Sequence, residues 1–153
     1  MEPLSREEAL RVLEEAPVAH LGVIDRGMPY VAPMSFVFSD DRVLFRTMAG
    51  RKLDALRANP NVCVEASRLD EETGDWASVI VLGRAREVDE DSVQQETVAA
   101  LLRKYEKIMG PLLSSRGIQP LGGMPHFIEV VIDEVSGMSS GGGFGVRTRP
   151  GRL

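Results

Sequence analysis

Two adjacent cations, Arg51 and Lys52, stand where a short helix is predicted to begin. A helix start carries partial positive charge, so its first turn usually holds acidic residues. Thr47 and Gly50 precede the pair, and together with free backbone N–H groups all four residues could converge on a phosphate. The alternative is a surface helix that tolerates unfavourable charges at a cost of about 0.3–1 kcal/mol. The residue types alone leave both interpretations open.

Three helices are predicted. Ser5 and Glu8 have the spacing of a capping box, which predicts a helix over residues 6–15. A helix over 51–59 follows the two cations and ends where the Asn-Pro pair disfavours helical backbone. The segment 89–107 begins with acidic residues and ends with basic ones, which is typical of a helix with a solvated outer face.

Alternating and apolar runs predict strands between these helices. Asp25 and Gly27 mark a tight hairpin turn, and the three strands that begin the series are expected to form a meander. Pro33 cannot donate to a ladder, so its strand is expected at an edge of the sheet or bulged. The run 79–82 is expected to be buried on both faces. The predicted strands are 18–25, 29–39, 42–48, 61–67, 76–88 and 126–137.

This order of elements defines the expected fold class. The strands are consecutive and mostly joined by hairpins, which predicts a mainly β (α+β) domain, a six-stranded antiparallel sheet closed as a small barrel with helices outside. Residues 1–136 form the predicted domain, and 137–153 form a tail rich in glycine and arginine.

Composition narrows the class of protein. A chain of 153 residues with a net charge of −5 and 5% aromatic residues argues against nucleic-acid binding. A single cysteine, Cys63, excludes an intrachain disulfide and fits a reducing cytoplasm. The sequence has no signal-peptide pattern and no apolar run of the ~20 residues that cross a bilayer. We expect a soluble cytoplasmic protein that does not bind membranes.

Other residues that could do chemistry carry weaker signals. His20 and His126 stand far apart with no further ligands at metal-binding spacing, so no metal site is predicted. Cys63 alternates with valines and is expected to be a structural thiol. The GGGFG stretch lacks the lysine–hydroxyl pair of a phosphate-binding P-loop.

The stretch PMSFVFSDDRVLFRTMAGRKLDALRANPNVCVEA, followed by WASVIVLGRAREV, resembles the pyridoxamine 5'-phosphate oxidase-like flavin-binding proteins. The similarity runs over about residues 5–136, and its branch is that of the small nitroimidazole-resistance type. The order and spacing of the motifs carry the resemblance rather than any single motif. It implies a split β-barrel, a homodimer, and FMN bound at the subunit interface.

The resemblance also implies roles for individual residues. Thr47, Arg51 and Lys52 match the segment that holds the FMN phosphate, which would explain the cations at the helix start. A second segment would run beside the isoalloxazine ring and contact it mostly through its backbone. Its residues are Met34, Ser35 and Phe36. Pro33 would explain why this segment is not fully paired with a strand and leaves backbone groups free for the ring edge.

Further positions match more distant parts of the cofactor site. Trp76 and Ser78 match a position that reaches the cofactor from the other subunit, although Trp76 could equally be a core or interface aromatic. Arg46 departs from the pattern, because the nitroimidazole-resistance type usually carries histidine there. It adds a third cation near the predicted phosphate, but alternation in the strand could equally turn it towards solvent.

The expected function is that of an FMN-dependent oxidoreductase acting on a small molecule. The alternatives are a deazaflavin-dependent oxidoreductase of the same fold, and a non-enzymatic carrier or sensor that binds flavin or haem. The substrate-phosphate motifs of true pyridoxamine phosphate oxidases are not recognisable, so vitamin B6 oxidation is not assigned. The tail arginines could reach an active site, but we expect the tail to be disordered; they are Arg147, Arg149 and Arg152.

Overall fold

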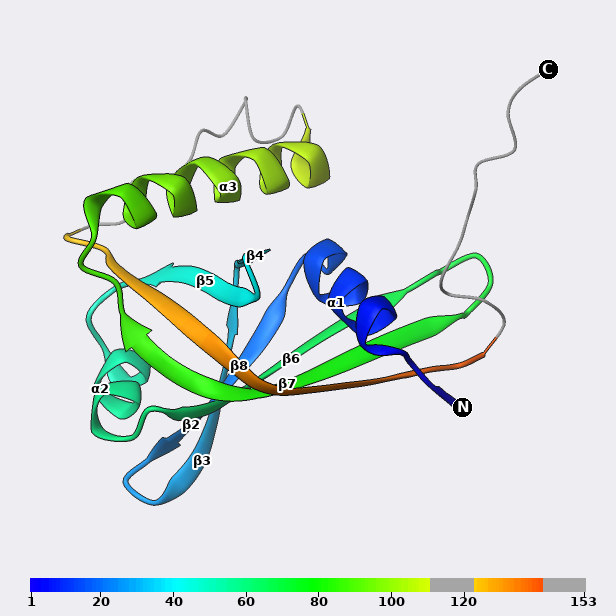
Figure 1. Ribbon diagram of the computed structural model, residues 1–153, viewed down its shortest axis with the longest axis horizontal. Coiled ribbons are helices and arrows are strands. Elements are labelled where there is room, and N and C mark those ends of the chain that lie inside the picture. Colours follow the sequence, from blue (N-terminus) through cyan, green and yellow to red (C-terminus); the bar gives the residue numbers. More distant parts are fainter. Residues whose placement is uncertain (111–122, 142–153) are drawn as a thin grey trace.

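The computed structural model describes residues 1–110 and 123–141. One sheet runs through the molecule, with helices packed against it (Figure 1). The tail arginines Arg147, Arg149 and Arg152 lie outside the described residues. The elements are β1 (Glu2–Pro3), α1 (Arg6–Glu15), β2 (Ala19–Asp25), β3 (Met28–Met34), β4 (Val37–Ser39), β5 (Arg42–Thr47), α2 (Arg51–Ala58), β6 (Asn61–Leu69), β7 (Trp76–Glu87), α3 (Asp91–Met109) and β8 (His126–Ser139).

The predicted antiparallel fold with flanking helices is confirmed. The sheet has the strand order β3-β2-β6-β7-β8-β5-β4, and β1 pairs with β8 beside this path. Within the described residues the sheet has eight strands rather than six. The short β1 is one addition, and the other arises because the predicted strand 29–39 is divided into β3 and β4. The last strand continues to Ser139, beyond the expected domain boundary at residue 136.

The two pairings of the predicted meander are present, but its second strand is interrupted. β3 pairs with β2 and β4 pairs with β5, so the two halves of the predicted strand 29–39 stand at opposite ends of the sheet order. The chain leaves the ladder at Ser35 and Phe36, where the backbone of Phe36 bonds to α3 instead of to a strand. This break lets the chain cross from one part of the barrel to another.

The hairpin and the edge strand follow the sequence prediction. Arg26 and Gly27 both have positive φ, 52° and 78°, as a two-residue hairpin turn with the twist of a β-ribbon requires. Asp25 pairs with Met28 on either side of the turn. Pro33 lies in β3, which is the terminal strand of the sheet order, so the sheet needs no N–H from it on the outer side.

The core lies on one face of the strands, beneath α1 and α2. α1 contacts β6, β7 and β8, and its capping box is formed by Ser5 and Glu8 as predicted. α2 packs on β2 through Leu53 and Leu56. The largest fully buried side chains include Phe36, Phe45, Leu13, Leu21 and Leu53. None of the helices in the described part of the chain has the length and apolar composition needed to cross a membrane.

The expectation that 79–82 is buried on both faces is wrong. Val79 and Val81 point into the core, but Ile80 is 48% and Leu82 is 46% exposed. The sheet is covered by helices α1 and α2 on its inner face only, so alternate residues of β7 reach the outer surface. The outer face of β7 therefore carries two exposed apolar side chains, Ile80 and Leu82.

Candidate functional site

The start of α2 offers free backbone donors. α2 begins at Arg51 directly after its N-cap residue Gly50, which provides no side-chain hydrogen bond. The N–H groups of the first helical turn therefore lack a capping acceptor from this residue. A side chain built at Gly50 would meet no atom within 4 Å, so the space beside this backbone is open. Open donors at the positive end of a helix favour an anion.

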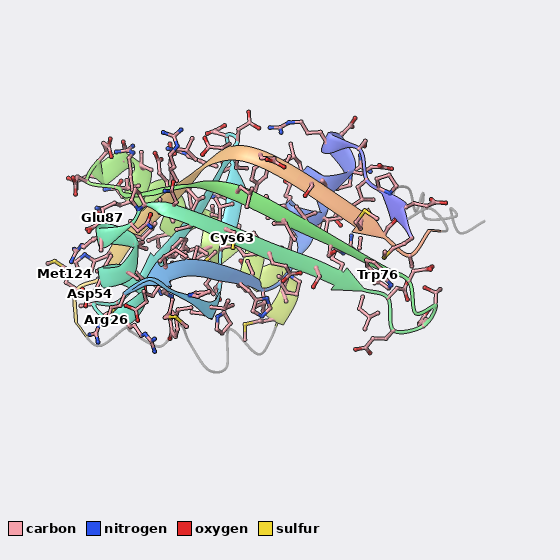
Figure 2. All side chains as sticks on the ribbon, turned by 90° about the horizontal axis from the view of Figure 1, so that it is seen from below. Arg26, Asp54, Cys63, Trp76, Glu87 and Met124 are labelled. Atoms are coloured by element: carbon pink, nitrogen blue, oxygen red, sulfur yellow. The ribbon has the colours of Figure 1, made fainter. Side chains whose placement is uncertain are left out.

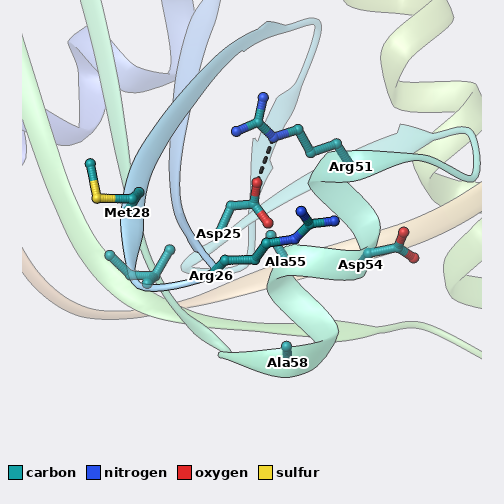
Figure 3. A pocket seen from close by; sticks show the side chains of 8 residues that line it. Asp25, Arg26, Met28, Arg51, Asp54, Ala55 and Ala58 are labelled. Carbon is teal, nitrogen blue, oxygen red and sulfur yellow. Dashed lines mark hydrogen bonds and ion pairs between the residues drawn. The ribbon is translucent and has the colours of Figure 1, made fainter.

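Arg51 is held from two sides. Its Nε donates a hydrogen bond of 2.6 Å to Oδ2 of Asp25, at the end of β2. Its guanidinium carbon lies 4.1 Å from the ring centroid of Tyr30, on β3. Because the contact to Asp25 uses Nε, the two terminal nitrogens extend away from this carboxylate, as Figure 3 shows. The arginine is positioned before any ligand arrives.

Lys52 points in another direction, towards β5. Its Nζ lies 5.7 Å from the ring centroid of the fully buried Phe45. Burial lowers the pKa of Lys52 from its ordinary value. Within residues 1–110 and 123–141 no carboxylate forms an ion pair with this amine. A partly desolvated cation without a counter-charge gains from a bound anion.

Thr47 and Arg46 are the other two residues that were predicted near the phosphate. They are neighbours at the end of β5, and their side chains lie on opposite faces of the strand. Thr47 is buried, and its hydroxyl donates to the carbonyl of Met48 at 3.4 Å, within the β5–α2 connection. Arg46 lies on the opposite face of the strand from Phe45 and Thr47 and pairs in register with Phe127. The structure thus gathers Thr47, Arg51 and Lys52 around the start of α2 and places Arg46 on the other side of the sheet.

The predicted ring-binding segment is fixed by α3. The N–H of Phe36 donates to the hydroxyl of Tyr105 at 3.1 Å, and its carbonyl accepts from Nζ of Lys104 at 3.1 Å. The expectation that these backbone groups are free is therefore wrong at Phe36. Met34 is buried at the end of β3, and Ser35 remains exposed between them.

Lys104 itself sits in an unusual environment. Its Nζ lies 3.6 Å from the centroid of the Phe36 ring. Burial lowers the pKa of Lys104 to about 8, against the opposing influence of Glu14 on α1. The neighbouring Tyr105 hydroxyl also donates to the carbonyl of Pro17 at 2.7 Å. These contacts join α3 to the break between β3 and β4.

A groove of about 860 Å³ lies between the β2–β3 turn and α2. Figure 3 shows Arg26 extending across it from the turn and Arg51 at the start of the helix. Its remaining lining consists of two carboxylates and four apolar side chains, Asp25, Asp54, Ile24, Met28, Ala55 and Ala58. The sequence analysis assigned no role to Asp25 beyond marking the turn and none to Arg26, because nothing local in the sequence brings the turn against α2.

Comparison with known proteins identifies the family. The sequence model of the family described as pyridoxamine 5'-phosphate oxidase matches residues 5–139. The chain belongs to this family. The resemblance stated for about residues 5–136 is therefore confirmed.

Individual members of the pyridoxamine 5'-phosphate oxidase family extend this result. An uncharacterised protein of Rhizobium meliloti (strain 1021) is 32% identical over 85 residues, and this match spans 56% of each chain, so only about half of the length of the curated relative is covered. An FAD-binding protein from Mesorhizobium loti is 26% identical, with a TM-score of 0.69, over 90% of this chain and 95% of that one. A candidate 5-nitroimidazole antibiotic resistance protein from Bacteroides thetaiotaomicron has 17% identity and a TM-score of 0.65, over 89% of this chain and 86% of that one, and shows the shared fold.

Trp76 and Ser78 lie at the start of β7, far from the start of α2 within one chain. Trp76 begins β7, and its N–H donates to Oγ of Ser140 at 3.1 Å. Figure 2 shows Trp76 at one end of the long strands and Asp54 of α2 at the other. A single copy therefore does not bring Trp76 to the predicted phosphate residues.

The two histidines of this chain each contact a separate carboxylate. Nδ1 of His20 is 2.9 Å from Oε2 of Glu65, and Nδ1 of His126 is 3.4 Å from Oε2 of Glu87. In the part of the chain that the structure describes, no group of three histidine, cysteine, aspartate or glutamate residues could hold a metal ion.

Proposed function

We propose that this chain is a flavin-dependent oxidoreductase that acts on a small molecule, and that it binds the FMN group, either as FMN itself or as part of FAD. The observation that carries the proposal is the uncapped start of α2 with two cations of different kinds beside it. Arg51 is oriented by Asp25 and Tyr30, whereas Lys52 is partly desolvated and lacks an ion-pair partner among the described residues. A phosphate would satisfy the backbone donors and both cations at once.

Each residue has a defined task in this proposal. Arg51, Lys52 and the α2 N–H groups bind the phosphate, and Thr47 lines the connection that leads to it. The segment Met34–Phe36 lies beside the ring, with exposed Ser35 as its accessible part and Phe36 anchoring it to α3. The bound flavin supplies hydride or electron transfer, so the protein supplies position, electrostatics and exclusion of water.

A homodimer forms part of the proposal. Val31, Gly22, Cys63 and Leu82 are register partners across four neighbouring strands, so they form one row on the outer sheet face. Val31 is 61% and Leu82 is 46% exposed, and an open apolar row of this kind suits a second copy of the chain. A second copy would also explain how Trp76 and Ser78 take part in a cofactor site that lies far from them in one chain.

Titration of the purified apoprotein with FMN tests the proposal, with riboflavin as the ligand that lacks only the phosphate. Arg51→Ala and Lys52→Ala are each expected to weaken FMN binding about 10–100-fold, because each removes a charge-assisted contact of about 1.5–3 kcal/mol. Riboflavin binding should be unchanged. If the wild-type chain binds no flavin, the proposal fails. If the variants weaken both ligands equally, the phosphate assignment fails.

Turnover is tested separately, with NADH or NADPH as reductant and a panel of small-molecule electron acceptors. Reductant oxidation that depends on bound flavin is expected. A protein that binds flavin but oxidises neither reductant would be a carrier or sensor instead.

FAD is a second candidate cofactor, because the relative from Mesorhizobium loti is described as FAD-binding and the groove beside Arg51 offers additional room. FAD contains the whole of FMN, so its FMN phosphate would meet the same residues of α2.

A further inference from the structure

We propose that the groove between the β2–β3 turn and α2 binds the adenosine-phosphate half of FAD, and that Arg26 is the residue that recognises it. This inference rests on the proposed function, because the groove matters to a flavin only if the flavin phosphate lies at the start of α2. The assignment of the FMN phosphate to the start of α2 requires neither the adenosine half of FAD nor Arg26.

The groove begins at the proposed phosphate site. Arg51, Asp54, Ala55 and Ala58 are spaced three, one and three residues apart, so they form one stripe along α2. From Arg51 to Ala58 this stripe is about 10 Å long, at 1.5 Å per residue. A ligand whose first phosphate is bound at Arg51 can therefore continue along the helix without crossing the barrel.

Small side chains keep the groove open. Ala55 and Ala58 contribute only methyl groups on the helix side of the groove, and the strand residues Ile24 and Met28 line its hairpin side, so Arg26 is the one long side chain that crosses it among the lining residues. The volume of about 860 Å³ lies within the range of small-molecule sites, about 300–1,000 Å³. FMN bound at the start of α2 would leave this space empty.

The lining carries the groups that a nucleoside phosphate needs. Arg26 is held at positive φ by the turn, and its side chain runs across the groove towards Asp54 (Figure 3). Arg26 and Arg51 can each bind one phosphate of a pyrophosphate. The carboxylate of Asp54 can accept hydrogen bonds from ribose hydroxyls, and Met28 offers a thioether for contact with a purine ring.

Charge balance also favours a nucleotide over a simple anion. The two arginines and two aspartates of the groove cancel in formal charge. A bare phosphate would gain little from such a lining, because each carboxylate opposes it. A ligand that carries both phosphates and hydroxyl donors matches both signs.

The test compares dissociation constants for FAD, FMN and ADP in the full-length protein. The variants are Arg26→Ala and Ala58→Leu, which fills the groove from an exposed helix position, with Arg6→Ala on α1 as a matched exposed control. Wild type is expected to bind FAD at least about tenfold more tightly than FMN. Arg26→Ala and Ala58→Leu should weaken FAD and ADP about tenfold or more, as expected for a lost arginine–phosphate contact, while FMN affinity stays unchanged.

Each contrary result has a distinct meaning. Equal affinity of the wild-type chain for FAD and FMN, or equal weakening of both by the variants, overturns the inference but leaves the proposed function in place. Absence of all flavin binding overturns the proposed function. In that case the assignment of the groove to FAD fails with it, and ADP binding that is lost in Arg26→Ala would show only a separate nucleotide site.

Discussion

Arg51 and Asp25 tie the first residue of α2 to the last residue of β2 through a hydrogen bond of 2.6 Å. Asp25 is mostly buried, with its side chain 16% exposed, whereas the Arg51 side chain is 59% exposed. The carboxylate therefore acts as a fixed anchor and the arginine as the part that solvent or a ligand can reach. The contact links the hairpin to the helix start and sets one end of the groove.

The Arg51–Asp25 contact should be measurable as an energetic coupling. Arg51→Ala and Asp25→Ala are each expected to lower the free energy of unfolding by about 0.5–1.5 kcal/mol, since the pair is a charged hydrogen bond with one exposed partner. The double variant should lose less than the sum, because both single changes remove the same contact. Urea unfolding of the four proteins measures this coupling. Strictly additive losses would show that the two side chains do not interact in solution.

Gly50 is expected to separate stability from cofactor binding. Its φ of 162° is extended backbone that any residue adopts, and an added Cβ meets no atom within 4 Å. Gly50→Ala should therefore leave the thermal midpoint unchanged or raise it slightly, because alanine restricts the unfolded chain. FMN affinity should fall about tenfold, or about 1.4 kcal/mol, since the methyl group occupies the approach to the free N–H groups.

The matched measurement for Gly50→Ala is riboflavin binding, which the methyl group should not affect. A variant that binds FMN as tightly as the wild-type chain would place the phosphate away from this backbone.

Lys104 should make stability depend on pH in the alkaline range. Burial lowers its pKa in the folded chain to about 8, from an ordinary value of 10.5. Between these values the unfolded chain binds more protons at this site than the folded chain, so stability should rise with pH there. Below pH 8 the cost of burying the charged amine is present in full. The contribution of one such group is at most about 1.4 kcal/mol per pH unit.

Lys104→Met keeps the length of the side chain and removes the titrating amine, so it is the natural comparison. Urea unfolding at several pH values between 7.5 and 9.5 should show wild type gaining stability relative to this variant. Parallel curves for the two proteins would mean that Lys104 titrates at its ordinary pKa.

Local signals in the sequence predicted some parts of the fold correctly, and contacts between distant residues explain the rest. The capping box of Ser5 and Glu8 spans three residues, so the start of α1 could be predicted directly. The contact of Lys104 with the Phe36 carbonyl joins residues 68 apart in sequence, and no local pattern encodes it. This contact lies where the predicted strand 29–39 is divided into β3 and β4.

The candidate site shows the same division between local and distant signals. The unusual cations at the start of α2 were visible in the sequence because they break a local charge preference. Their surroundings were not, because Asp25 and Tyr30 reach Arg51 only after the β2–β3 hairpin folds against the helix. For Arg46, alternation along β5 already predicts the face opposite Thr47, but only the structure shows that the Thr47 face is the buried one.

The outer face of the sheet supplies the last prediction. Leu82 is 46% exposed and pairs in register with Cys63, whose Sγ occupies the space beside Gly22. These residues make an apolar row that ends at Glu134, the register partner of Leu82 on β8, and such a row on an open sheet face is stabilised when a second copy covers it. Leu82→Glu introduces a charge at this row without disturbing the core, so it should convert a dimer into a folded monomer. Burying an unpaired carboxylate on each copy costs several kcal/mol, which is enough to dissociate a micromolar dimer.

Sedimentation velocity and thermal unfolding together test the Leu82→Glu prediction, with Leu102→Glu on the outside of α3 as a control of similar exposure, 37%. Leu102→Glu should leave the sedimentation coefficient unchanged. In the proposed dimer Trp76 and Ser78 complete the cofactor site from a second copy, so the Leu82→Glu monomer should also bind FMN more weakly than wild type. A variant that stays dimeric would place the subunit interface elsewhere, and a monomer with full FMN affinity would show that one chain forms the whole cofactor site.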